Sequence, residues 1–228
     1  MASLKRSKDR KVSNSLTPSG GVRIANSFGL PSGKAYSCPG ATSVCEEICY
    51  AGKLERLRPN VKSALMHNWD ILREAEAVDM FEHLFDMIDD FEAECDKFKA
   101  PKEFRIHWDG DFFNASYIWA WQKVIDGHPD THFWVYTRVE AAARTLQASN
   151  LTLYFSGDRD NIATAERMRE AGIPVAMLGS TFEEAREAVG RGAMCPEQRG
   201  QVALNGACIA CGICLKGKSN VLFSITKK

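Results

Sequence analysis

Short β-rich runs alternate with longer helical stretches along most of this chain of 228 residues. A parallel β-sheet wrapped by helices has this alternation, because each strand needs a crossover connection before the next parallel strand can begin. The pattern predicts one α/β domain over residues 1–228 with six strands. The candidate strands are GVRIANSF at 21–28, EFRIHW at 103–108, HFWVYTR at 132–138, LTLYFSG at 151–157, PVAMLGS at 174–180 and VLFSIT at 221–226.

Helical periodicity fills the intervals between these runs. Residues 60–98 predict one broken helix or two successive helices. One face of this stretch is apolar and is expected in the core, and its members are Phe81, Leu84, Ile88, Phe91 and Cys95. Later helices are expected over 114–125, 139–148, 160–171 and 181–189. Asn114 and Asp160 are the expected N-caps, and Gly172 is an expected C-terminal stop.

Charge is segregated along the chain, although Lys and Arg equal Asp and Glu at 29 each. Residues 74–96 contain ten acidic residues and no Lys or Arg, which is typical of the solvated face of a helix. Residues 1–20 are interpreted as a basic, flexible segment, and both basic ends of the chain are candidates for contact with nucleic acid. No run has the length and apolar character of a membrane span or a signal peptide, so we expect a cytoplasmic protein without a membrane partner.

Four cysteines gather in a C-terminal segment rich in Gly and Pro, at residues 190–217. Cys195, Cys208, Cys211 and Cys214 form the pattern C-x12-C-x2-C-x2-C. Thiols stay reduced inside cells, so these residues are expected to bind metal. Two intervening residues let a backbone wrap around a cubane, and a remote fourth cysteine completes its ligands. The spacing favours a 4Fe-4S cluster, and a four-cysteine zinc site is the alternative.

Three more cysteines lie between the first two predicted strands, in the stretch CPGATSVCEEICYAG. A group of three thiolates, here Cys38, Cys45 and Cys49, would leave one iron of a cluster open to a small molecule. The alternative is a zinc site completed by a histidine, for which His67, His83 and His107 are the candidates. One cluster is therefore expected, and two are possible on this pattern.

The organisation of the chain resembles the radical S-adenosylmethionine enzymes. In that family three cysteines follow the first strand of a six-stranded partial (β/α) barrel, as they do here. The resemblance implies a partial barrel, S-adenosylmethionine as a possible cofactor, and an auxiliary cluster on the C-terminal cysteines. It implies cofactor contacts for Asp109, Gly110 and Asp111 in HWDGDFF, and for Ser156 and Asp158 in FSGDRD. The spacing C-x6-C-x3-C differs from the usual C-x3-C-x2-C of the family, and Gly52 stands where a further cysteine would follow.

The chain also closely resembles a cysteine-rich family of actinobacteriophage proteins. The likeness lies in the SCPGA loop, the strand that ends near DGDF and the final C-x2-C-x2-C. It implies a phage protein in the cytoplasm of a host cell, with no activity and no host partner identified. Three hypotheses remain: a radical-type or other redox enzyme, a non-catalytic iron-sulfur protein that regulates or binds nucleic acid, and a zinc-stabilised interaction protein. Whether the protein is an enzyme stays open.

Overall fold

Seven parallel strands form one open sheet in the computed structural model, which describes residues 3–8, 11–12, 24–204 and 206–225. The strand order is β1-β2-β3-β4-β5-β7-β6. The strands are β1 (Ser27–Gly29), β2 (Glu103–Asp109), β3 (His132–Thr137), β4 (Leu151–Gly157), β5 (Val175–Gly179), β6 (Gly192–Met194) and β7 (Asn220–Ser224). The predicted α/β class with a parallel sheet is confirmed. Among the described residues no helix is long and apolar enough to cross a membrane.

The predicted count of six strands is wrong by one. The additional strand, β6, is only three residues long and pairs with β7 at the edge of the sheet. A strand this short has no alternating pattern from which it could be predicted. The first predicted strand, 21–28, is also shorter in the structure, because β1 begins at Ser27. Residues 21–23 of that prediction lie outside the described residues.

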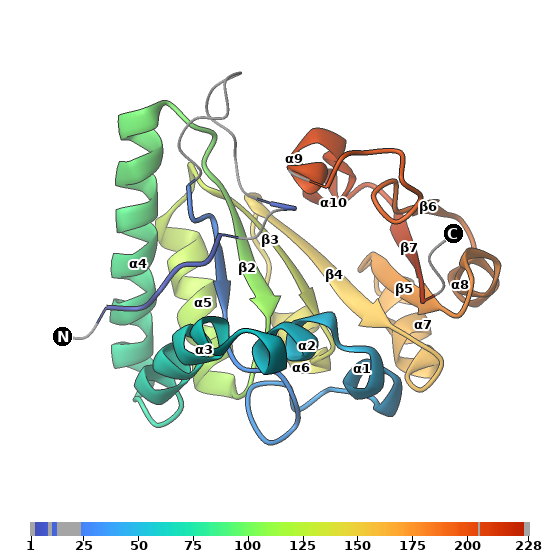
Figure 1. Cartoon of the computed structure of the whole chain (residues 1–228), viewed down its shortest axis with the longest axis horizontal. Coiled ribbons are helices and arrows are strands. Elements are labelled where there is room, and N and C mark those ends of the chain that lie inside the picture. The colour runs from blue at the N-terminus through green and yellow to red at the C-terminus, as the bar shows by residue number, and fades with distance from the viewer. Residues whose placement is uncertain (1–2, 9–10, 13–23, 205, 226–228) are drawn as a thin grey trace.

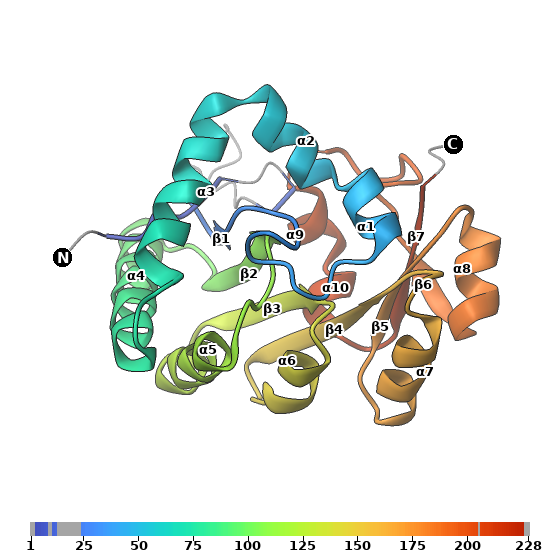
Figure 2. The ribbon, with the colours of Figure 1, turned by 90° about the horizontal axis from the view of Figure 1, so that it is seen from below.

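Five helices cover one face of the sheet (Figures 1 and 2). They are α4 (Ala77–Phe98), α5 (Ala115–Gly127), α6 (Glu140–Thr145), α7 (Ile162–Glu170) and α8 (Phe182–Val189). The N-cap prediction for Asn114 is confirmed, since its side chain accepts from the Tyr117 backbone N–H at 2.8 Å. The prediction for Asp160 is wrong, because Asn161 precedes α7 and Asp160 instead accepts from the backbone N–H of Val44.

The main core lies between the sheet and helices α4 and α5. Phe91 of α4 meets Phe104 of β2 with ring centroids 5.0 Å apart, and Cys95 is fully buried beside them, as predicted. His107 joins this core as well, and its Nε2 lies 3.0 Å from the Tyr117 hydroxyl. Buried and less buried residues alternate along β2 as far as Ile106, and the alternation breaks at His107, in the stretch where the β1–β2 register shifts between Ser27 and Gly29.

The connection between β1 and β2 crosses the carboxyl ends of the strands (Figures 1 and 2). The part of this connection that lies there carries α1 (Ser43–Ile48), α2 (Tyr50–Leu57) and α3 (Pro59–Leu72), and α4 completes the connection to β2. Two short helices near the C-terminus, α9 (Ala207–Cys211) and α10 (Ile213–Lys216), lie on the face of the sheet opposite α4 to α8. The two groups of cysteines therefore belong to the two segments that lie outside the helical layer.

The N-terminal segment, of which residues 3–8 and 11–12 are described, lies against β1 and α3. Ser7 forms an antiparallel bridge with Ser27. Asn68 of α3 accepts from the Lys5 backbone N–H at 2.8 Å and donates to the carbonyls of Lys5 and Gly29, both at 3.0 Å. Arg6 pairs with Glu94 at 2.9 Å. Two basic residues of this segment, Lys5 and Arg6, are thus anchored to the domain.

Replacing Asn68 with Ala should lower the free energy of unfolding by about 1–3 kcal/mol, because it removes the side-chain partner of the buried Gly29 carbonyl and of the partly buried backbone groups of Lys5. Asn60→Ala, at an exposed position of α3, is the matched control and should change it little. Urea unfolding followed by circular dichroism measures both variants. Equal stability of the two variants would contradict the anchoring role of Asn68.

Candidate functional site

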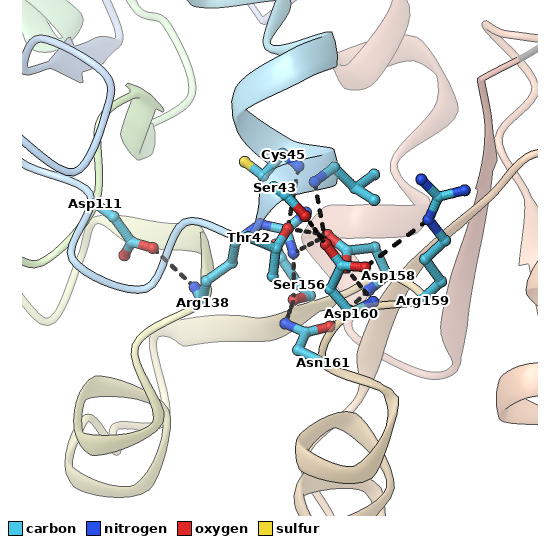
Figure 3. Close-up of polar contacts among 11 residues, drawn as sticks. Thr42, Ser43, Cys45, Asp111, Arg138, Ser156, Asp158, Arg159, Asp160 and Asn161 are labelled. Atoms are coloured by element: carbon cyan, nitrogen blue, oxygen red, sulfur yellow. Dashed lines mark hydrogen bonds and ion pairs between the residues drawn. The ribbon is translucent and has the colours of Figure 1, made fainter.

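Polar residues from three strand ends meet beneath the segment that carries Cys38, Cys45 and Cys49, which we name the cysteine loop. Asp109 ends β2 and Asp111 follows it, Arg138 directly follows β3, and Asp158 directly follows β4. In a parallel sheet these positions share one edge, where ligands of such folds bind. Asp111, Arg138 and Asp158 are brought together at this edge (Figure 3). Asp111 and Asp158 are two of the residues for which the family resemblance implied cofactor contacts.

Asp111 is a buried carboxylate whose oxygens are already hydrogen-bonded. Its Oδ1 accepts from the Thr137 hydroxyl at 2.6 Å and from the Phe112 backbone N–H at 2.8 Å. Its Oδ2 accepts from the Arg138 backbone N–H at 2.8 Å. Burial raises the pKa of Asp111 to about 6, although these donors act in the opposite direction. The residue joins the end of β2 to the end of β3.

An ion pair between Arg138 and Asp158 continues this connection to β4. Arg138 Nη1 lies 2.6 Å from Asp158 Oδ2, and the Asp158 side chain is fully buried. The Thr42 hydroxyl of the cysteine loop donates to the same Oδ2 at 2.6 Å, while the Asp160 backbone N–H donates to Oδ1 at 2.9 Å. Asp158 therefore links the cysteine loop, β3 and β4, and we name the set Thr42, Asp111, Arg138 and Asp158 the latch (Figure 3).

Further contacts fix α1 of the cysteine loop against the end of β4. The Asp160 carboxylate accepts from the Ser43 hydroxyl and from the Val44 backbone N–H, the latter at 3.2 Å. Thr42 caps α1 by accepting from the Cys45 backbone N–H at 3.0 Å. Gly40 packs so closely on the Arg138 backbone that an added Cβ would lie 2.7 Å from its carbonyl oxygen. Only glycine fits at this contact.

The three N-terminal cysteines lie around the latch. Arg138 donates a hydrogen bond to Cys45, and Cys49 is close enough for its charge to influence Cys45. Burial raises the pKa of Cys45, and the Arg138 guanidinium opposes this effect. Cys49 accepts from the Gly52 backbone N–H at 3.3 Å. Cys38 lies on the side of Asp111, and burial together with that carboxylate raises the pKa of Cys38 well above its ordinary value.

Of the aspartate carboxyl groups at this edge, that of Asp109 accepts the fewest hydrogen bonds. Its Oδ1 accepts from the Gly110 backbone N–H at 2.9 Å, whereas Oδ2 is buried without a hydrogen-bond donor among the described residues. Burial, followed by the nearby Glu55 carboxyl, raises the pKa of Asp109 to about 9. Gly110 has a φ of 84°, and a Cβ there would lie 2.6 Å from Ser37 Oγ. The Ser156 side chain takes no part in the latch, and its carbonyl accepts from Arg138 and Asn161.

The four C-terminal cysteines gather between β6 and α10. Cys195 follows β6, and its sulfur accepts from the backbone N–H groups of Glu197 and Gln198, which oppose the rise in its pKa caused by burial. Cys208 and Cys211 lie in α9, while Cys214 lies in α10 beyond Gly212, a residue with a φ of 66°. Burial raises the pKa of Cys214 to about 11, and negative charge on Cys195 and Cys211 acts in the same direction.

Positive charges and one hydroxyl surround this C-terminal group. The Tyr136 hydroxyl donates a hydrogen bond to the Cys214 sulfur, and the Arg105 guanidinium, whose carbon lies 5.5 Å from the Tyr136 ring centroid, lowers the pKa of Cys214. The Lys11 carbonyl accepts from the Cys208 backbone N–H at 2.8 Å. Burial acts to lower the pKa of Lys11, but the Glu197 carboxylate, 2.9 Å from its Nζ, holds it above its ordinary value.

Within the described part of the chain, no group of three or more His, Cys, Asp or Glu side chains stands in a metal-ligating arrangement. Either cysteine group would need side-chain rotations to converge on a metal. Two of the histidines considered for a zinc site contact other groups. Nε2 of His67 lies 2.9 Å from the Ser3 carbonyl oxygen, and His107 lies in the aromatic core.

The roles of Thr42, Glu55 and Lys11 were not predicted from the sequence. Thr42 could be found by its position three residues before Cys45, since Thr is a common N-cap. Glu55 and Lys11 are distant in sequence from their partners, so no local signal reveals them.

The whole chain is similar to known phage proteins. Residues 2–217 match the family model described as Gene product 88. The Gene 88 protein of Mycobacterium phage L5 is 48% identical over 239 residues, and that of Mycobacterium phage D29 is 49% identical over 240 residues; both alignments cover all of each chain. No solved structure matches. The predicted resemblance to a phage family is confirmed, whereas none of these matches supports the likeness to radical S-adenosylmethionine enzymes.

Replacing Asp109 with Asn should flatten the pH dependence of stability between pH 7 and 8.5. The folded carboxyl keeps its proton up to a pKa of about 9, whereas the unfolded one loses it near pH 4, so wild-type stability falls as pH rises between these values. The decline is at most about 1.4 kcal/mol per pH unit for one proton. Urea unfolding at several pH values measures it.

Asp79→Asn, at an exposed position of α4, is the control and should keep the wild-type slope. The window lies above the range in which His107 contributes, because burial lowers the folded pKa of His107 to about 3 and an unfolded histidine titrates near 6.5. A slope of Asp109→Asn equal to that of the wild type would contradict a protonated Asp109.

Proposed function

We propose that this protein, which belongs to the Gene product 88 family, is a phage iron-sulfur protein that holds a 4Fe-4S cluster on its four C-terminal cysteines. The observation that carries the proposal is the gathering of four thiols around backbone N–H donors and positive charges. The ligands would be Cys195, Cys208, Cys211 and Cys214. The reducing cytoplasm of a host cell would keep these thiols available.

The donor set suits a cluster in several respects. Backbone N–H groups of Glu197 and Gln198 already point at the Cys195 sulfur, and hydrogen bonds to the sulfurs are among the factors that set a cluster's potential. Gly212, with its positive φ, turns the chain between Cys211 and Cys214. Glycine adopts this backbone conformation without the strain that a Cβ would cause. The segment can therefore turn tightly enough to wrap around a metal group.

Positive charges beside this group offset part of the effect of burial, which favours thiols over thiolates. Four thiolate ligands carry negative charge, and burial alone raises the pKa of Cys195 and Cys214, which disfavours the ligating form. Lys11 and Arg105 lie close enough to lower these two pKa values. A bound cluster would supply one-electron redox chemistry, while Lys11, Arg105 and the Tyr136 hydroxyl stabilise the charge on its ligands. Four cysteines also suit zinc, which is the alternative that elemental analysis distinguishes.

A radical S-adenosylmethionine-like activity is the second candidate, and the position of the N-terminal cysteine loop favours it. Cys38, Cys45 and Cys49 lie over the carboxyl edge of the parallel sheet, where active sites of such folds lie. The latch contacts occupy the oxygens of Asp111 and Asp158, so in this proposal these residues position the loop. Asp109, with an oxygen free of donors among the described residues, and Gly110 are better placed for a cofactor contact.

A regulatory or nucleic-acid-binding role is the remaining alternative. It rested on the basic ends of the chain. In the described part of the N-terminal end, Arg6 pairs with Glu94 and Lys11 pairs with Glu197. These ion pairs leave less positive charge for phosphates, so this role receives less support than metal binding.

Replacing Cys211 with Ala should remove the cluster and lower the stability of the fold, because binding free energy at such a site is also folding free energy. Anaerobically prepared wild-type protein should contain about four irons and four sulfides for each cluster. Cys95→Ala is the matched control, since Cys95 lies in the core and should leave the iron content unchanged. Zinc as the metal in the wild type, or full iron in Cys211→Ala, would contradict the proposal.

Replacing Cys45 with Ala should lower iron content only if a second cluster binds at the N-terminal loop. In that case dithionite-reduced wild-type protein should cleave S-adenosylmethionine to 5'-deoxyadenosine, and both Cys45→Ala and Asp111→Ala should abolish or weaken cleavage. Chromatography of the nucleoside product measures this, again with Cys95→Ala as control. Identical iron in the wild type and Cys45→Ala, with no 5'-deoxyadenosine from either, would exclude the second candidate and leave the C-terminal cluster untouched.

A further inference from the structure

Helix α2 exposes an apolar stripe. Tyr50, Leu54 and Leu57 follow one another at i, i+4 and i+7, so they lie on one helix face. Their exposed fractions are 50%, 38% and 73%, respectively, which are high for large apolar side chains. A cluster of exposed apolar residues is typical of an interaction surface, whereas single exposed apolar residues are common on any protein.

Four basic residues lie on α2, at its C-cap or at the start of α3. Lys53, Arg56, Arg58 and Lys62 are exposed, and none of them forms an ion pair within the described part of the chain. The only acidic residue of α2 points elsewhere, since Glu55 accepts from the backbone N–H of Ser32 at 3.0 Å and from its hydroxyl. We name Tyr50, Leu54, Leu57 and the four basic residues the basic face. Its natural partner is a surface that is both acidic and partly apolar.

Helix α4 of the same chain provides such a surface. Asp79, Glu82, Asp86 and Asp90 are exposed, follow helical spacing along one side, and form no ion pair among the described residues. Val78, one turn before Glu82, is 56% exposed. Other acidic residues of α4 already have partners, for example Asp96 with Lys102 and Asp89 with His128. We name Val78 and the four unpaired acidic residues the acidic face.

The two faces do not cover each other within one chain, because both are exposed there. Helix α2 lies at the carboxyl edge of the sheet, α4 runs along its side, and α3 connects them (Figures 1 and 2). Any contact between the faces is therefore made by two molecules. The net charge of zero means that no overall repulsion opposes such an association.

We infer that the basic face of α2 docks on the acidic face of α4 of a second copy of this chain. The leucines favour a protein partner over nucleic acid, because phosphates and sugars would leave Leu54 and Leu57 uncovered. Four positive and four negative charges give the contact complementarity, and the apolar residues supply its buried centre. Association should weaken as ionic strength rises, because salt screens exposed charges.

Sedimentation velocity of the full-length protein over a range of concentrations tests this inference. Wild-type protein should self-associate at low salt. The double charge reversal Arg56→Glu/Arg58→Glu should weaken association about tenfold or more, as should Glu82→Lys/Asp86→Lys. Lys123→Glu/Arg169→Glu changes charge by the same amount as the first pair at exposed positions outside both faces, and it should associate like the wild type. Circular dichroism verifies that every variant is folded.

A mixture of the two reversed variants provides the decisive arm. Their altered faces are complementary again, so the mixture should associate more tightly than either variant alone. A monomeric wild type at every concentration and salt, an equal effect of the control reversal, or a mixture no tighter than its components would overturn the inference. So would a monomer that binds a single-stranded oligonucleotide through Arg56 and Arg58.

Discussion

The buried ion pair between Arg138 and Asp158 is the contact on which the carboxyl edge of this protein depends. It connects the ends of β3 and β4, Asp111 extends the connection to β2, and Thr42 attaches the first cysteine loop. Removing one partner of a buried pair typically costs 3–5 kcal/mol, because the other charge stays buried without compensation. Charged residues at three strand ends therefore hold the loop that carries Cys38, Cys45 and Cys49 in place.

The two cysteine groups differ in how the fold supports them. The N-terminal group lies on a loop held by side chains of the sheet, whereas the C-terminal group lies on short helices and on the end of an edge strand. Lys11 is near both groups, since its carbonyl accepts from Cys208 and its ammonium lies 6.0 Å from the ring centroid of Tyr50, the neighbour of Cys49. The N-terminal segment is therefore part of the structure around the thiols.

The sequence was sufficient to predict the parallel α/β fold, because five of the predicted strands are long runs with clear boundaries. The sequence also singled out Asp111 and Asp158 through the family resemblance, and both lie at one edge because residues that follow the parallel strands of a sheet meet there. It did not reveal β6, which is too short to have a pattern, or the role of Asp160, whose carboxylate contacts α1 instead of capping α7. Long-range partners such as Lys11 with Glu197 have no local signal in the sequence.

Native mass spectrometry of anaerobically prepared full-length protein tests the central claim most directly, because it identifies the bound group by its mass. The account predicts that the protein carries the mass of a 4Fe-4S unit, and that replacing Cys195, Cys208, Cys211 and Cys214 together removes it. A protein that carries zinc instead, or that carries no inorganic group after reconstitution with iron and sulfide, would contradict the account.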